Sequence, residues 1–158
     1  MDLSQYLSPN MPVGFTNLFA KRLDRLCSFE VNEAEDGDTI KQGQALIAPE
    51  GYHMTVTGDG RIQLDYGPPE HGVRPAVDPM MRSVADVYES EAVGVILTGM
   101  GRDGSSGMRA IKKNGGITIA QDKATSTVFG MPKIAILEGN VNKILPLSKI
   151  PEQLMQWC

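Results

Sequence analysis

The stretch that decides the fold reads Ala92-Val93-Gly94-Val95-Ile96-Leu97-Thr98-Gly99-Met100-Gly101-Arg102-Asp103-Gly104. Residues 92–97 are apolar without alternation, which is typical of a strand buried on both faces of a parallel sheet. A glycine-rich turn follows, then a helix predicted over 105–113 and a second apolar strand over 117–120. This order predicts a β-α-β unit with its chemistry on the first turn, because open parallel sheets place ligand sites at the carboxyl ends of their strands.

The chain before this unit is predicted to hold one helix and several short strands. Apolar residues recur at intervals of three and four over 12–26, which predicts an amphipathic helix. Its expected apolar face consists of Phe15, Leu18, Phe19, Leu23 and Leu26. Turn signals such as Asp36-Gly37-Asp38 then separate four strand candidates, which predicts a meander of antiparallel hairpins. The strand candidates cover residues 28–31, 45–48, 54–56 and 61–64.

The remaining elements are predicted to complete an α/β domain. Asp78 as N-cap and Pro79 as the first helical residue predict a helix that runs to about Glu89. Beyond the β-α-β unit we expect a helix over 132–137, a strand over 142–145 and a final helix over 150–157. The predicted fold class is α/β, a mainly parallel doubly wound sheet with an antiparallel hairpin section, and residues 1–158 are expected to form a single domain.

Composition excludes several classes of function. The formal net charge of −4 and the pI near 5.1 provide no attraction for nucleic acid or anionic lipid. The longest apolar run, 92–97, is too short to span a bilayer, so a cytoplasmic protein without membrane insertion is expected. Cys27 and Cys158 lie far apart and show no metal-ligand spacing, so neither a metal site nor a disulfide is predicted. No cofactor is expected either.

The glycine-rich turn permits three interpretations. Gly99, Gly101 and Gly104 form the GxGxxG pattern of dinucleotide-binding sites, with Asp122 at the end of the next strand. Asp103 opposes that interpretation, because like charges about 4 Å apart repel by roughly 4 kcal/mol at an effective dielectric of about 20. In the second interpretation Asp103 caps the following helix. In the third, the helix N-terminus keeps Asp103 ionised, and the carboxylate orients a catalytic imidazole.

The segment Leu97-Thr98-Gly99-Met100-Gly101-Arg102-Asp103-Gly104 is similar to the LTGMGxDG segment of the chemotaxis protein-glutamate methylesterase (CheB) family. Further stretches resemble the family in the same order, so that the resemblance extends from about Asn10 to the C-terminus. These stretches are 11–16, 33–38, 47–49, 53–54, 74–78 and 129–132. The resemblance implies the fold of the family's C-terminal catalytic domain.

The resemblance also implies an esterase activity. The family hydrolyses γ-glutamyl methyl esters on chemoreceptors and releases methanol, and some members deamidate glutamines; it uses a serine nucleophile, a histidine base and an aspartate. By resemblance, Asp103 is that aspartate. The backbone around Met100 and Gly101 then lies beside the reacting ester, where an N–H could help to hold the oxyanion. Chemoreceptors are the partners that the resemblance implies.

Two departures from the family pattern bear on activity. The family's serine stands in a GxSTGG turn, and residues 1–158 contain no such segment. The family's histidine stands in a QHMP segment, and Asn10 occupies its place here; asparagine does not take up a proton near neutral pH. His53 and His71 are expected to be structural or solvated, and Ser105 is expected to be a helix-capping serine.

The expected protein is therefore an N-terminally truncated methylesterase domain, without a receiver domain and inactive by itself. The first alternative is a non-catalytic module that binds a receptor or another chemotaxis protein. Its expected contact surfaces are the helix with Phe15 and Phe19 and the loop at Arg74. The second alternative is a dinucleotide-binding protein that uses the turn from Gly99 to Gly104.

Overall fold

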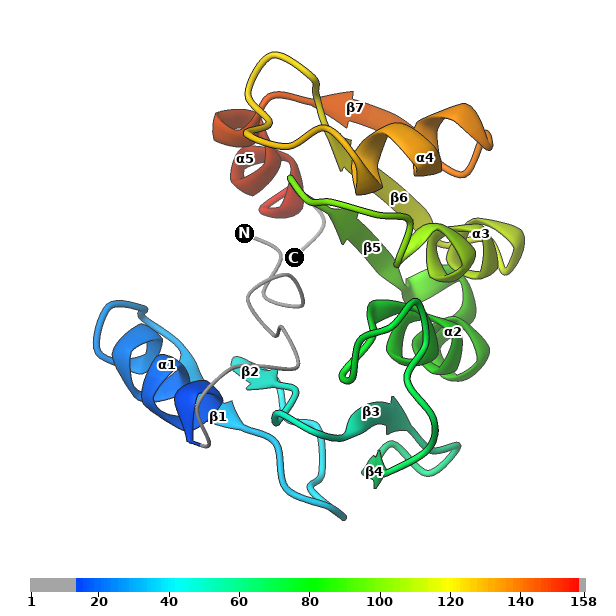
Figure 1. Ribbon diagram of the computed structural model, residues 1–158. Helices are drawn as coiled ribbons and strands as arrows, with labels where there is room; N and C mark the ends of the chain where they lie inside the picture. The colour runs from blue at the N-terminus through cyan, green and yellow to red at the C-terminus, as the bar shows by residue number, and fades with distance from the viewer. Residues whose placement is uncertain (1–13, 157–158) are drawn as a thin grey trace.

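A computed structural model describes residues 14–156 of the chain (Figure 1). None of the helices in this part of the chain has the length and apolar composition that crossing a membrane requires. In chain order the elements are α1 (Phe15–Asp24), β1 (Glu30–Glu33), β2 (Gln44–Ile47), β3 (His53–Val56), β4 (Ile62–Asp65), α2 (Val77–Tyr88), η2 (Glu89–Glu91), β5 (Val93–Ile96), α3 (Ser105–Lys113), β6 (Ile117–Gln121), α4 (Met131–Leu137), β7 (Lys143–Leu145), η3 (Leu147–Lys149) and α5 (Ile150–Leu154).

Strands β5, β6 and β7 form one parallel sheet in that order, with helices on both of its faces. Helices α2, α3 and α4 pack on one face, around a core that includes Ile96 and Met108. Helix α5 packs on the other face, where Ile150 contacts Ile119. The structure therefore confirms the α/β class and the β-α-β unit, and α3 has the predicted bounds.

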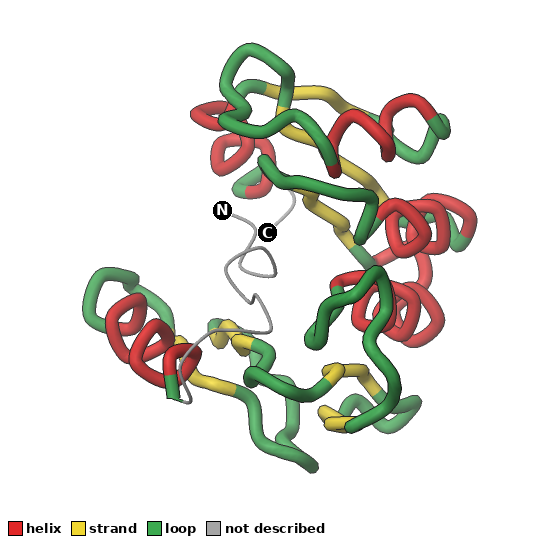
Figure 2. Tube along the Cα trace, viewed as in Figure 1, coloured by secondary structure: helices red, strands yellow, loops and turns green. Residues whose placement is uncertain are grey.

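The strands before α2 depart from the predicted meander (Figure 2). Strands β3 and β4 form an antiparallel hairpin, but β1 and β2 pair in parallel, so a continuous antiparallel meander is wrong. The parallel pairing follows from the path of the connection 34–43, because the first turn of this connection is hydrogen bonded to β4. There the Gly37 N–H donates to the Ile62 carbonyl over 2.8 Å, and the Ile62 N–H donates to the Asp38 carbonyl over 2.8 Å. A second turn at 42–43 then starts β2 in the direction of β1.

Helix α1 is shorter than predicted and buries a different set of residues. It ends at Asp24, so Leu26 lies beyond it and is 74% exposed, and Leu18 is also exposed. The buried residues are Thr16 and Ala20, while Phe19 and Leu23 pack beside them against β1 and β2. Thr16 is buried because its hydroxyl donates a hydrogen bond to Glu33 of β1, a contact that apolar periodicity does not reveal.

Helix α2 begins at Val77, with Ala76 as its N-cap, so the prediction that Asp78 is the N-cap is wrong. Ala76 has no side-chain acceptor for the first helical N–H groups. The acceptor comes from the turn after β5, which is distant in sequence. A tertiary contact therefore replaces the local cap that the sequence predicted.

Helices α2 and α3 lie side by side on one face of the sheet (Figure 1). Gly107 makes this contact possible, because a Cβ at that position would lie 2.3 Å from the Cβ of Met81. The close approach brings the first turns of the two helices together near the carboxyl end of β5. That junction holds the candidate site.

Candidate functional site

The turn between β5 and α3 is fixed by the segment that leads into α4. The Gly99 N–H donates to the Val128 carbonyl over 2.8 Å, and the Gly99 carbonyl accepts from the N–H groups of Gly130 at 2.9 Å and Met131 at 2.8 Å. Gly130 allows this approach because a Cβ there would lie 2.4 Å from the Gly99 oxygen. The turn is therefore held firmly on the side that faces α4.

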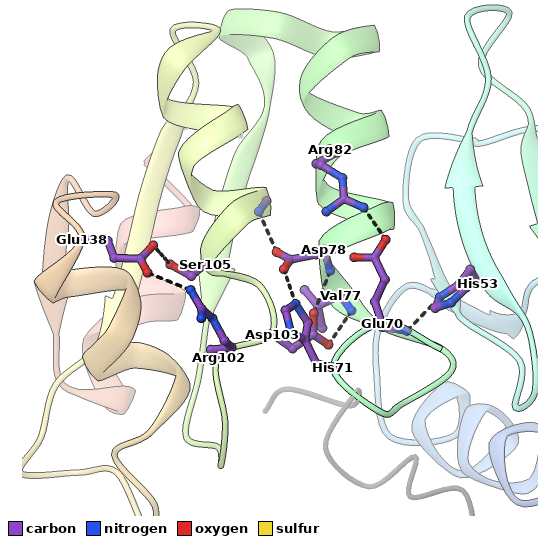
Figure 3. Close-up of polar contacts among 12 residues, drawn as sticks. His53, Glu70, His71, Val77, Asp78, Arg82, Arg102, Asp103, Ser105 and Glu138 are labelled. Carbon is purple, nitrogen blue, oxygen red and sulfur yellow. Dashed lines mark hydrogen bonds and ion pairs between the residues drawn. The ribbon is translucent and has the colours of Figure 1, made fainter. Parts of the chain in front are cut away.

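Asp103 lies on this turn and points at the N-terminus of α2 (Figure 3). Its Oδ2 accepts the Val77 N–H over 2.7 Å, and its Oδ1 accepts the Asp78 N–H over 3.0 Å. Asp103 is only 6% exposed. The N-cap of α3 is Gly104, without a side-chain cap, so the interpretation that Asp103 caps the following helix is wrong. It caps the neighbouring helix α2 instead.

Asp78 makes the reciprocal contact from the first turn of α2. Its Oδ1 accepts the Gly107 N–H of α3 over 2.7 Å, and its Oδ2 lies 2.8 Å from Nε2 of His71 (Figure 3). Asp78 is 1% exposed, so both of its oxygens obtain partners within the protein. The first turns of α2 and α3 are thus joined by two crossed carboxylates, Asp103 and Asp78.

Burial raises the pKa of the Asp103 carboxyl above its ordinary value. The N–H groups of Val77 and Asp78 each lower that pKa by less than burial raises it. The negative charge of Asp78 raises the pKa further, and His71 lowers it. The N–H groups that hold the Asp103 oxygens belong to α2, so the helix N-terminus beside this carboxyl is that of α2 and not that of the following helix α3.

An outer ion pair adjoins the two carboxylates. The Arg82 guanidinium of α2 lies 2.6 Å from Glu70, in the loop that also carries His71 (Figure 3). The hydrogen bond to Glu70 raises the pKa of Arg82, and the charges of Asp78 and Asp103 add to this effect. Three carboxylates therefore face Arg82 and the His71 ring.

Glu70, His71 and Asp78 offer ligand atoms that lie within 4.8 Å of one another, which is a spacing that could hold a cation. Each of these groups already has a protein partner, because Glu70 pairs with Arg82 and Asp78 pairs with His71. A cation would have to displace Arg82 and break the His71–Asp78 contact. The arrangement therefore favours an ion-pair network over a metal centre.

A pocket of about 330 Å³ lies between the β3–β4 hairpin, the loop 67–70 and the first turn of α2. Asp103 does not line it, so the pocket and the crossed carboxylates are separate features. Its lining residues are His53, Thr55, Gln63, Asp65, Gly67, Pro68, Pro69, Glu70 and Pro79.

Met100 and Gly101 form the exposed tip of the turn. Met100 is 84% exposed, and Gly101 has a φ of +96°, which favours glycine. The dinucleotide interpretation finds no support in this geometry. Two buried carboxylates stand beside the N-terminus of α3, and one of them already accepts the Gly107 N–H that a phosphate would need.

The two histidines and Ser105 have structural partners. The Ala76 N–H donates to Nδ1 of His53, whose Nε2 lies 3.1 Å from the Pro68 carbonyl, so this buried ring joins β3 to the segment before α2. The Ser105 hydroxyl donates to Glu138 over 2.7 Å, and Ser105 is the first residue of α3 rather than its cap. Asn10, the position of the family's catalytic histidine, lies outside the described residues.

The sequence singles out Asp103 as a candidate but does not indicate the residues that surround it. The local pattern predicts that Asp78 is a helix cap and that His71 is a structural or solvated side chain. A sequence signal for Asp78 did exist, because the family resemblance includes residues 74–78. That resemblance does not reveal that Asp78 contacts α3, since Gly107 lies 29 residues away in the chain.

Comparison with known proteins assigns this geometry to a class. Residues 3–154 match the family model described as CheB methylesterase. The crystal structure of the Thermotoga maritima CheB methylesterase catalytic domain aligns with a TM-score of 0.88 and 44% sequence identity, covering 94% of this chain and 80% of that chain. The fold is therefore the α/β fold of a CheB-type catalytic domain.

The curated relatives agree with this class. The protein-glutamate methylesterase/protein-glutamine glutaminase of Pyrococcus abyssi is 54% identical over 95% of this chain, and that of Symbiobacterium thermophilum is 50% identical over 92%. The chain spans 42% and 40% of the lengths of these two relatives. The chain belongs to the CheB methylesterase family.

Proposed function

We propose that this chain carries the aspartate-bearing part of a protein-glutamate methylesterase active site, with Asp103 as the catalytic aspartate. The observation that supports this most strongly is a buried carboxylate on a fixed turn at the carboxyl end of β5, within a segment that matches the family's LTGMGxDG. The proposed substrate is a γ-glutamyl methyl ester on a chemoreceptor. Deamidation of glutamine is the corresponding reaction on an amide.

In this proposal Asp103 orients an imidazole through its carboxylate. Each oxygen accepts one N–H from α2 and retains a lone pair for a ring N–H. A backbone N–H around Met100 or Gly101 helps to hold the oxyanion. The oxygen of the family's serine bonds to the carbonyl carbon of the ester, and the serine proton passes to the imidazole. The bond from that carbon to the methoxy oxygen then breaks, and the methoxide takes the proton and leaves as methanol. Water then hydrolyses the acyl-enzyme and releases the glutamate.

We further propose that residues 1–158 by themselves hydrolyse the ester far more slowly than a complete catalytic domain. They contain no GxSTGG segment, and Asn10 stands where the family has its histidine. In subtilisin, removal of the serine or the histidine alone lowers kcat by about a millionfold. The chain is then the aspartate-bearing part of the site without its nucleophile and base.

Methanol release from a methylated receptor fragment tests this proposal. The 158-residue chain is compared with a complete catalytic domain of a relative, at equal concentration and over a pH series. We expect release by the chain at least about a thousandfold below the complete domain, because triad members act as a unit. Turnover within tenfold of the complete domain would contradict the proposal that the chain is inactive alone.

The proposed correspondence between Asn10 and the family's histidine can be tested without turnover. In Asn10→His, the new imidazole is expected to titrate at a higher pH than in the double variant Asn10→His/Asp103→Asn, because a nearby carboxylate stabilises the imidazolium. NMR titration of the ring protons measures both values. Asp86→Asn in place of Asp103→Asn is the matched control. If the imidazole at position 10 has the same titration midpoint in all three proteins, the proposal that Asn10 takes the place of the family's histidine is wrong.

A further inference from the structure

A second buried carboxylate lies beside Asp103, and the proposed mechanism does not use it. Asp78 is 1% exposed, yet its side chain carries a titratable acid into the junction between α2 and α3. Burial of a charged group is costly unless the group is paired and hydrogen bonded. Asp78 meets that requirement through the Gly107 N–H at 2.7 Å and His71 at 2.8 Å.

The contacts of the two aspartates depend on each other. Asp103 precedes α3 and accepts the N–H groups of Val77 and Asp78, whereas Asp78 belongs to α2 and accepts the N–H of Gly107. A shift of either helix N-terminus would therefore break a hydrogen bond at both carboxylates. The location of the Asp103 oxygens is set by the same turn of α2 that the Asp78 side chain ties to α3.

His71 connects this buried pair to solvent. Its side chain is 32% exposed, and its Nε2 contacts Oδ2 of Asp78, which is the oxygen that does not bind Gly107. The charged groups that face the pair within residues 14–156 come from three places. They are Glu70 and His71 of the preceding loop, Asp78 and Arg82 of α2, and Asp103 of the turn.

We propose that Asp78, held by His71, is a positioning residue that sets both the location and the charge of Asp103. The catalytic meaning of this inference rests on the proposed function, but the coupling between the two aspartates does not. Asp78 ties the first turn of α2 to α3, and that turn presents the two N–H groups that hold the Asp103 oxygens. His71 holds the Asp78 carboxylate in place through a contact of 2.8 Å, and its charge lowers the pKa of Asp103.

The variant Asp78→Asn separates the charge of Asp78 from its packing. Asparagine has nearly the same shape and keeps one oxygen that can accept the Gly107 N–H. It removes the negative charge that faces Asp103. The variant His71→Gln removes the imidazole at a partly exposed position and retains a hydrogen-bond donor. Asp86→Asn is the matched control, because Asp86 is an exposed aspartate on the same helix whose side chain contacts Asn114.

The experiment is a carbon-13 NMR titration of the Asp103 carboxyl in the 158-residue chain and these three variants. We expect the Asp103 midpoint to fall in Asp78→Asn, because a neighbouring negative charge is lost, and to rise in His71→Gln, because a positive charge is lost. The amide proton signals of Val77 and Asp78 should move in both variants. The midpoint in Asp86→Asn should match the unmodified chain.

An Asp103 midpoint that moves no further in Asp78→Asn and His71→Gln than in Asp86→Asn would overturn the inference. If Asp78→Asn does not fold, His71→Gln alone decides, since its side chain is partly exposed. The result is also distinct from the test of function. If the proposed function is disproved but the Asp103 midpoint moves as expected, the coupling between the two aspartates stands. If the Asp103 midpoint does not move, the coupling is disproved whatever the turnover.

Discussion

At Asp103, burial and hydrogen bonding act on the carboxyl in opposite directions. Desolvation raises its pKa, and each of the two N–H groups at the start of α2 lowers it by less. Asp103 therefore differs from a typical surface aspartate that is stabilised by a helix N-terminus. Its presence on the turn was predictable from the sequence, but its direction and environment depend on residues about 25 positions away.

This raised pKa predicts an unusual pH dependence of stability. A carboxyl whose pKa is higher in the folded than in the unfolded state favours folding when it is protonated. Its contribution is lost as pH rises through the folded pKa, and is fully present below the ordinary value of 3.8. We therefore compare the unfolding free energy of the unmodified chain with that of Asp103→Asn. The first minus the second should increase as pH falls from the folded pKa of Asp103 to 3.8.

Urea denaturation of both proteins at a series of pH values measures this difference. The other carboxylates are common to the two proteins, so the general loss of stability in acid largely cancels. Asp86→Asn provides the matched control and should give a difference that changes less with pH. A difference that decreases as pH falls would show that Asp103 has a lowered pKa instead.

At the scale of elements, the α2–α3 pair determines the geometry of the site. The contact is close because Gly107 faces Met81, and it brings the two helix N-termini within reach of the crossed aspartates. Sequence patterns located both helices nearly correctly, but they did not show that the helices cap each other. Asp103, from the turn before α3, caps α2, and Asp78 of α2 caps α3. A search for capping residues within one helix therefore misassigns Asp78.

The variant Gly107→Ala tests how much this contact contributes. In a free helix the change would stabilise by about 1 kcal/mol, because alanine is the better helix former. Here the new Cβ would lie 2.3 Å from the Met81 Cβ, which is close to the backbone and cannot swing away. We expect the clash to dominate and to lower the unfolding free energy by about 1–3 kcal/mol.

Chemical denaturation checks this sign, with Arg109→Ala on the exposed side of α3 as the control. The control should change stability by no more than about 0.5 kcal/mol. Amide signals at Val77 and Asp78 should shift in Gly107→Ala, because α3 moves relative to α2. If Gly107→Ala has a higher unfolding free energy than the unmodified chain, α2 and α3 can move apart at that position without loss of stability.

At the scale of the whole molecule, the described residues form three separate sheets rather than one. Small sheets need packing against other elements to be stable. Helix α1 packs against β1 and β2, and residues of α2 pack against the β3–β4 hairpin as well as in the core of the larger sheet. Helix α2 therefore links the hairpin, the parallel sheet and the candidate site. This arrangement explains why the strands before α2 were harder to predict than the β-α-β unit.

Local sequence signals are sufficient to predict the β-α-β unit, the bounds of α3 and Asp103 as a candidate carboxylate. These features have local signals, namely an unbroken apolar run, a glycine-rich turn and a specific motif. Long-range packing, by contrast, makes β1 and β2 run parallel, places Asp103 at the N-terminus of α2, and brings Asp78 and His71 beside it. The physical reason is that hydrogen-bond partners are selected by how helices and strands pack, and this packing brings together groups that no short stretch of sequence contains.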